Sequence, residues 1–196
     1  LGKIAFAACL SLEFISIPES VICLNGNSFC EWDGELECLS ANFIYEDDVL
    51  FNKDKSEIIS FRNQEIESYI IPDSVTSIGD GAFGCCSSLS SLVIPDSVVN
   101  IKGNPFCYWK GKLECLSASF IYEDNVLFNM DKSKLISFRN QEAKSFIIPD
   151  GVKSIGKCAF VDCYSLVSIS IPNSVTNIGD SAFDGCSSLS NLVIPN

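Results

Sequence analysis

Histidine is absent from the 196 residues, and basic residues are few. Without histidine the chain lacks the commonest general base and the commonest metal ligand of proteins. Lysine and arginine number 13 against 25 aspartate and glutamate residues, so the net charge is −12. That balance argues against binding nucleic acid or anionic lipid, and it favours basic or neutral partners. Apolar runs of the roughly 18 residues that a transmembrane helix requires are also lacking, so membrane insertion is not expected.

Internal repetition dominates the sequence. A short coil of 23 residues alternates with a long block of 54, which gives a larger repeat of 77 residues. Within that repeat, 36–65 and 113–142 differ at only five of 30 positions. The chain is therefore predicted to be a single tandemly duplicated array over 1–196, a fragment of a longer array. The repeats are marked by Ile-Pro dipeptides at Ile17, Ile71, Ile94, Ile148, Ile171 and Ile194.

The short coil has one apolar pattern, which predicts its local structure. Residues 89–94 end in apolar–polar alternation, typical of a short strand with one buried face, and Pro95 removes the next amide donor. Gly79 permits a sharp turn, and 80–83 suits one helical or 3₁₀ turn. One coil cannot bury its own apolar face, so successive coils must stack. The inward positions of this coil are Val75, Ile78, Ala82, Phe83, Cys86, Leu89, Leu92 and Ile94.

The predicted fold is a right-handed parallel solenoid of about eight coils. One face carries a parallel β-sheet, and the other carries short helical or 3₁₀ turns and irregular coil. Each long block holds an additional β-hairpin insertion, at about 42–66 and 119–143. The apolar segment 4–10 looks like a secretory signal, but it keeps the register of the array, because Gly2 and Phe6 fall 154 residues before glycine and phenylalanine of a later coil.

These residues resemble the BspA-like class of leucine-rich repeats over the whole chain. The resemblance rests on the coil Ile-Pro-x-Ser-Val-x-x-Ile-Gly-x-x-Ala-Phe-x-x-Cys-x-Ser-Leu, on the variant at 104–106 and on the island at 123–132. It implies a leucine-rich repeat solenoid of the L-domain-like type. It also implies a cell-surface or secreted protein of bacteria or parasitic protists that adheres to host proteins, matrix proteins or other cells. Fold alone does not establish that function.

Eleven cysteines are more than this repeat requires, and their number is odd. Cys9, Cys86, Cys163 and Cys186 share one inward position of the coil and are expected to pack as small apolar side chains. A Cys30–Cys38 disulfide, repeated as Cys107–Cys115, is a possible pairing, although opposite edges of a coil are usually too far apart to bridge. The adjacent pair Cys85-Cys86 is interpreted as a coincidence of sequence. Abundant thiols favour a reducing compartment, whereas the resemblance favours the exterior.

No catalytic or cofactor site is predicted. Asn52, Asp54 and Ser56 have the spacing of a calcium loop, but glycine is missing at its sixth position and glutamate at its twelfth. They are interpreted as a solvated hairpin turn. The many serines have no histidine base to activate them. We therefore expect a protein that is not an enzyme and has no cofactor or metal.

The outward positions of the strands form the candidate binding surface, because exposed apolar groups on one sheet face exceed what solubility requires. β-Propensity alone is the alternative explanation. In the long blocks Leu39 and Ala41 are expected to point inward. The expected outward residues are Phe14, Ser16, Cys38, Ser40, Ile70, Val93, Cys115, Ser117, Ile147, Ser170 and Val193.

Two functions fit these patterns. The first is a non-catalytic module that binds a protein partner through the sheet face and the hairpin edges. The second is a structural array that self-associates end to end, or through Cys38 and Cys115, into an oligomer or filament.

Overall fold

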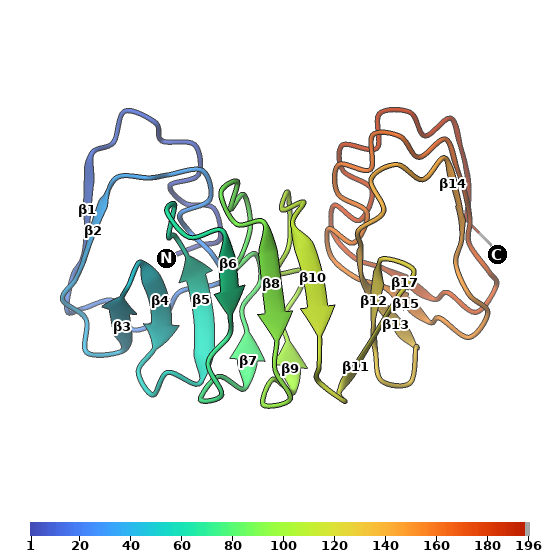
Figure 1. Ribbon diagram of the computed structural model, residues 1–196. Helices are drawn as coiled ribbons and strands as arrows, with labels where there is room; N and C mark the ends of the chain where they lie inside the picture. Colours follow the sequence, from blue (N-terminus) through green and yellow to red (C-terminus); the bar gives the residue numbers. More distant parts are fainter. Residues whose placement is uncertain (195–196) are drawn as a thin grey trace. The chain divides into compact units, whose positions relative to one another are not determined.

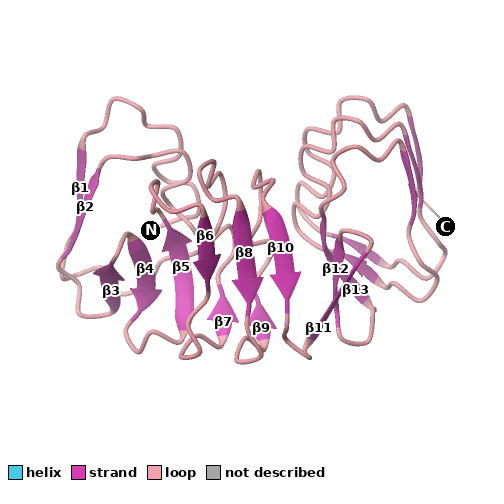
Figure 2. Cartoon of the chain, viewed as in Figure 1, coloured by secondary structure: helices cyan, strands magenta, loops and turns pink. Residues whose placement is uncertain are grey.

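The computed structural model describes residues 1–194 and consists of strands joined by turns and loops (Figures 1 and 2). The chain forms two compact units, Leu1–Ser117 and Ala118–Asn196. Each unit is a stack of coils whose strands pair in parallel with those of neighbouring coils. Both units are therefore β-solenoids, as the repeat pattern predicts.

The first unit contains three sheets. The order β1-β2 forms one, β6-β8-β10 the second and β3-β4-β5-β7-β9 the third. Each short coil contributes one strand to the second sheet and a two-residue strand to the third, which the sequence did not predict. The strands are β1 (Phe14–Ile17), β2 (Glu35–Cys38), β3 (Phe43–Glu46), β4 (Val49–Asn52), β5 (Glu57–Phe61), β6 (Ser68–Ile70), β7 (Ser77–Ile78), β8 (Ser91–Ile94), β9 (Asn100–Ile101) and β10 (Lys112–Cys115).

The second unit repeats this plan with two sheets, β14-β16-β18 and β11-β12-β13-β15-β17. Its strands are β11 (Phe120–Glu123), β12 (Val126–Asn129), β13 (Lys134–Phe138), β14 (Ser145–Ile147), β15 (Ser154–Ile155), β16 (Ser168–Ser170), β17 (Asn177–Ile178) and β18 (Asn191–Val193).

The insertion in each long block is a three-stranded meander. Strand β3 pairs antiparallel with β4 and β4 with β5, and β5 then pairs in parallel with β7. Strands β11, β12, β13 and β15 repeat the arrangement. The predicted hairpin is thus present, but its last strand is also a rung of the solenoid, so the insertion extends the sheet of the coil.

The predicted helical turn is absent from residues 1–194, where the structure contains no helix. Alternate backbone amides in the turn segment donate to carbonyl oxygens of the next coil instead of to carbonyl oxygens of their own coil. Gly81 N donates to Asn104 O at 3.1 Å, Phe83 N to Pro105 O at 2.8 Å, and Cys85 N to the following coil as well. Stacking therefore removes the donors that a helix would need.

The core consists of the predicted inward side chains. All eight positions of the coil from Val75 to Ile94 are buried. Phe83 is fully buried, and its ring centroid lies 5.4 Å from Phe61 and 6.4 Å from Phe106. Gly79 is needed for space, because a Cβ there would lie 2.8 Å from Ile58 O. The pattern at 175–194 is less buried, because that coil packs against a neighbour on one side only.

The segment that looks like a secretory signal is a coil of the first unit. Ile4 N donates to Asn27 O at 2.8 Å, and Phe6 N donates to Ser28 O at 2.9 Å. The Phe6 ring stacks on Phe29 with centroids 6.0 Å apart. Residues 2–17 therefore belong to the stack, as their register predicts.

Arg62 directly follows β5, where the chain passes to β6 without a turn segment like that of residues 26–33. Its guanidinium lies 4.4 Å from the Trp32 ring and donates to Trp32 O, to Gly34 O at 2.7 Å and to the Tyr45 hydroxyl at 3.2 Å. Burial lowers the pKa of Arg62. This side chain joins the meander to the preceding coil.

Candidate protein-binding surface

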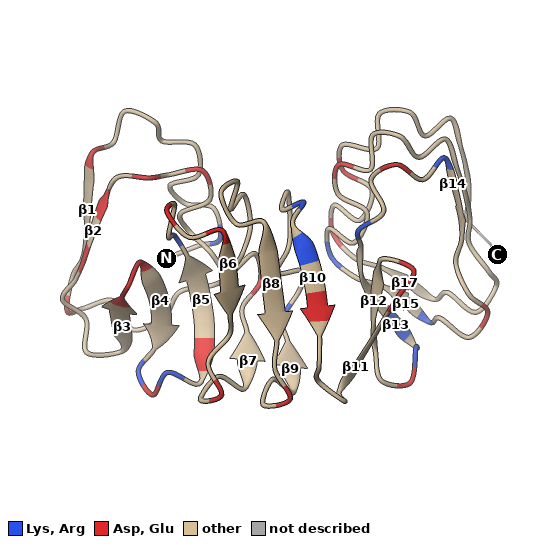
Figure 3. Cartoon of the chain, in the orientation of Figure 1, with Lys and Arg blue, Asp and Glu red and all other residues tan. Residues whose placement is uncertain are grey.

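Strands β6, β8 and β10 lie side by side in one sheet (Figure 1), and their register places the outward side chains in two rows. In one row Ile70 is opposite Val93, which is opposite Glu114. In the other row, serines of β6 and β8 are followed by Lys112. Ile70 is 67% exposed and Val93 is half-buried. An apolar pair thus lies beside a strand that carries charges of both signs (Figure 3).

The two-stranded sheet of β1 and β2 is more acidic. Phe14 is exposed and pairs with Glu35, and Ser16 pairs with Glu37. The Ser16 hydroxyl donates to the Glu37 carboxylate at 2.8 Å. Phe14 and Ser16 therefore face outward, as predicted, beside two carboxylates.

The sheet of β14, β16 and β18 in the second unit has a simpler face. Ile147, Ser170 and Val193 lie side by side in one outward row. Ile147 is 75% exposed and Val193 is 67% exposed. This face carries no charge in that row, so apolar contact dominates its chemistry.

Four of the predicted outward residues do not face outward, which corrects the register assigned to the long blocks. Ser40 and Ser117 are buried, and their hydroxyls donate to carbonyl oxygens of the preceding coil, at 2.7 Å and 2.6 Å. Cys38 and Cys115 are half-buried at the carboxyl ends of β2 and β10. A slip of one residue turns every side chain of a strand to the opposite face.

The same correction brings other residues to the surface. Leu39 and Leu116 are exposed rather than inward, and Glu37 and Glu114 occupy the outward strand positions. The alternation Glu-Leu-Glu-Cys at 35–38 contained this register, because charged residues alternate with apolar ones.

Cysteine pairing also differs from the expectation. Cys30 forms a disulfide with Cys85, with their Cα atoms 5.9 Å apart, and Cys38 and Cys115 remain thiols. The Cys30–Cys38 and Cys107–Cys115 pairings, which the distance between opposite edges of a coil disfavoured, therefore do not form. Burial raises the pKa of the Cys38 and Cys115 thiols. Cys86, adjacent to the disulfide, is buried as predicted, and burial raises its pKa to about 12.

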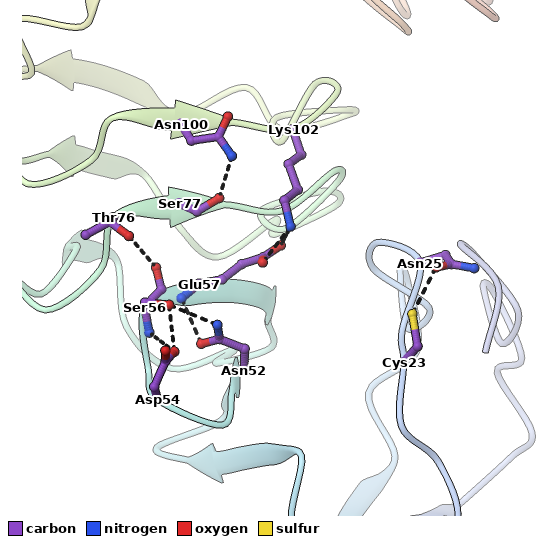
Figure 4. Close-up of polar contacts among 10 residues, drawn as sticks. All are labelled: Cys23, Asn25, Asn52, Asp54, Ser56, Glu57, Thr76, Ser77, Asn100 and Lys102. Atoms are coloured by element: carbon purple, nitrogen blue, oxygen red, sulfur yellow. Dashed lines mark hydrogen bonds and ion pairs between the residues drawn. The ribbon is translucent and has the colours of Figure 1, made fainter.

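The turn at residues 52–56 of the meander satisfies polar groups of its own side chains (Figure 4). One Asp54 oxygen accepts hydrogen bonds from the Ser56 amide at 3.1 Å and from its hydroxyl at 2.6 Å. These bonds hold the pKa of Asp54 below its usual range. Among residues 1–194 no group of three or more potential ligand side chains could hold a metal ion. The turn is a surface loop of the kind that the sequence indicated.

The figure also shows a contact between the meander and the stack. Lys102 in the loop after β9 forms an ion pair with Glu57 of β5, at 2.6 Å, and Asn100 donates to the Ser77 hydroxyl at 3.1 Å (Figure 4). Across the described chain, no helix has the length and apolarity required to cross a bilayer.

Comparisons with known proteins agree with this architecture. A model of the BspA type leucine rich repeat region matches six copies, over residues 1–49, 55–137 and 134–196. A search of curated proteins finds no match.

Solved structures of bacterial leucine-rich repeat proteins are similar to the chain. A leucine rich cell surface protein from Faecalibacterium prausnitzii is 29% identical, with a TM-score of 0.50, over 92% of this chain and 47% of that one. The pneumococcal vaccine antigen PcpA is 21% identical, with a TM-score of 0.60, over 94% of this chain and 51% of that one. The chain thus spans about half the length of these proteins. Repeats matched along nearly its whole length show that the chain belongs to the BspA-type leucine-rich repeat family, whose repeats generally bind proteins.

Proposed function

We propose that this chain is the protein-binding part of a cell-surface protein that adheres to host proteins, matrix proteins or other cells. The observation that carries the proposal is an isoleucine repeated on the outward sheet faces. Ile70 and Ile147 are equivalent in the 77-residue repeat, and each is at least two-thirds exposed on its own sheet. Large apolar side chains in such positions lower solubility unless a partner covers them.

The surroundings of these isoleucines suit a protein partner. In the first unit Ile70 and Val93 lie beside Glu114 and Lys112, which gives an apolar centre with a charged edge. Protein interfaces combine a desolvated apolar centre with a polar rim in this way. The net charge of −12 favours a basic or neutral partner surface.

A location outside the cell is supported by the disulfide and by one relative. Disulfides persist in oxidising environments and are rare in the cytosol, so Cys30–Cys85 favours the exterior. The similar protein of Faecalibacterium prausnitzii is described as a cell surface protein. Both observations point to the compartment that adhesion requires.

Self-assembly through cysteines has less support. Cys38 and Cys115 are half-buried, and burial raises the pKa of both thiols, which lowers the fraction of reactive thiolate. A disulfide between two copies would have to form at these half-buried positions, at the carboxyl ends of β2 and β10. The exposed isoleucines are more accessible to a partner than these thiols.

Adhesion of beads coated with the chain, to immobilised matrix proteins and to epithelial cells, tests the proposal. Ile70→Glu with Ile147→Glu should reduce retention at least tenfold, because burying an unpaired carboxylate costs several kcal/mol. Ile22→Glu is the matched control, since Ile22 is also exposed but lies outside the strands. Equal retention of the double variant and the wild type would overturn the assignment of the sheet face.

A further inference from the structure

Two adjoining hollows form a groove on the turn side of the first unit. Each has a volume of about 480 Å³, and both are lined by Ser87 and Tyr108. One also touches Glu31, Asp33 and Gln64, and the other continues past Lys110 and Lys112. The groove thus leads from an acidic rim, over the turn segment that contains Ser87, to a basic rim.

No turn segment lies between β5 and β6, and this brings the acidic and basic rims of the groove together. The Asn27 amide donates directly to Asp80 O at 2.9 Å, and its side chain donates to Gly81 O at 2.9 Å. Residues 26–33 therefore stack on the turn of the coil at 72–94, although the meander of β3, β4 and β5 lies between them in sequence. The Cys30–Cys85 disulfide fixes this contact.

The floor of the basic half is rigid. Trp109 is buried and donates from its indole nitrogen to Leu89 O at 2.6 Å. A side chain at Gly111 would overlap the Trp109 ring, so only glycine fits at this position of the groove. Tyr108 is 44% exposed and lines both halves of the groove.

Comparison of the duplicated segments separates the residues that line the groove from the residues that pack or turn. Residues 18–35 and 95–112 align, and the positions that pack or turn are retained, including Trp32 and Trp109. Three other positions have changed, from glutamate, aspartate and glutamate at 31, 33 and 35 to tyrosine, lysine and lysine at 108, 110 and 112, and all of these residues except Glu35 line the groove. The same scaffold therefore accepts either charge at the rim, and this chain presents one version at each end of the groove.

We propose that this groove binds an extended peptide segment of a partner protein that carries a basic residue at the Glu31 and Asp33 end and an acidic residue at the Lys110 and Lys112 end. The proposal rests on the proposed function and adds the chemistry of the partner. Opposite charges at the two ends select both the charge and the direction of the segment.

Charge compensation within the protein supports the choice of a basic residue at the first end. The charge of Asp33 is partly offset within the protein, because buried Arg62 interacts with it electrostatically. Within residues 1–194 Glu31 forms no salt bridge and is exposed. The negative charge at this end is thus carried mainly by Glu31, on the solvent side of the groove, where a basic side chain can reach it.

Capped peptides test the proposal. One series has arginine near the amino end and aspartate near the carboxyl end, separated by three to six glycine and serine residues. A second series reverses the order, and a third has glutamine and asparagine in their places. Titration of the ¹⁵N-labelled protein, followed at the amides of Ser87 and Tyr108, should give one charged order about fivefold to tenfold tighter binding than the neutral series.

A charge exchange provides the decisive variant. Asp33→Lys with Lys110→Asp, together with Glu31→Lys and Lys112→Glu, should reverse which peptide order binds more tightly. The tandem repeat already shows that the scaffold accepts both charges at 33/110 and at 35/112. Exchanging Asp54 and Lys132 in the meander turns is the matched control and should leave the preferred order unchanged.

Equal affinity for all three series, or a preferred order that survives the exchange, overturns the groove proposal. The result is independent of the sheet-face assignment, because Ile70 and Ile147 do not line the groove. Loss of bead adhesion in Ile70→Glu/Ile147→Glu with no peptide selectivity would refute the groove alone. Peptide selectivity with unchanged adhesion of that variant would refute the sheet face alone.

Discussion

The Cys30–Cys85 disulfide should contribute a large share of the stability of the first unit. It joins positions 55 residues apart, and the closed loop contains β2 to β7, including the whole meander of β3, β4 and β5. Closing a loop of this length lowers the entropy of the unfolded chain by an amount worth about 4 kcal/mol at 25 °C. Cys30→Ser with Cys85→Ser should therefore lower the free energy of unfolding by about that amount and the melting temperature by roughly 10–15 °C.

The duplication supplies a control within the same chain. Cys107 is the equivalent of Cys30, but Asp162 stands at the position equivalent to Cys85. Hydrogen exchange of the double variant should therefore accelerate across 43–70 and remain unchanged across 120–147. Thermal unfolding followed by circular dichroism, with and without a phosphine reductant, should show that reductant lowers the melting temperature of the wild type only.

Cys38→Ser with Cys115→Ser is the matched control, because both residues are thiols. The reasoning would be refuted if peptide mapping of the non-reduced protein yielded Cys30 and Cys85 as alkylated thiols. It would also be refuted if removing both cysteines left the unfolding midpoint unchanged.

Three further changes test the packing and the electrostatics. Phe83→Ala should lower the free energy of unfolding by about 3–5 kcal/mol in urea titrations because its ring is fully buried, whereas Phe14→Ala should change it by less than about 1 kcal/mol. Arg62→Ala should cost about 3 kcal/mol, since it removes a charged donor from one buried and two partly buried acceptors; wild-type stability in that variant would contradict the structural role of Arg62. Burial raises the pKa of both Tyr45 and Tyr69 to about 12, so the unfolded chain loses these protons first as pH rises, and stability should fall between pH 10 and pH 12. Tyr45→Phe/Tyr69→Phe should flatten that fall, and an absorbance titration at 295 nm with both tyrosines ionising near pH 10 would contradict it.

Local periodicity predicted the coil well because its contacts repeat at one spacing. The inward positions from Val75 to Ile94 follow from alternation and from the need to stack, and the structure buries all of them. The helical turn was wrong because the amides of Gly81 and Phe83 are used by the next coil. Propensity describes one segment alone, whereas these donors are committed by a neighbour about 23 residues away.

The structure of the long blocks was harder to predict from the sequence, because their contacts depend on how each block folds. Whether Cys30 reaches Cys85 is decided by the absence of a turn segment after β5, which places two turns in contact across an intervening coil. The groove arises from the same contact, and the sequence of a single repeat could not predict it because its lining comes from separate segments. The changes at 31/108, 33/110 and 35/112 were visible in the sequence, but the position of Glu31, Asp33, Lys110 and Lys112 beside one groove was not.

Hydroxyl-radical footprinting of the chain, alone and bound to a matrix protein that retains it, tests the binding assignment most directly. Oxidation of Ile70 and Ile147 should fall at least threefold on binding, because contact excludes solvent from fully desolvated anchors. Oxidation of Ile22 should stay the same. Protection of Ile22 with Ile70 and Ile147 still oxidised at the rate of the unbound chain would contradict the claim that this protein binds through its sheet faces.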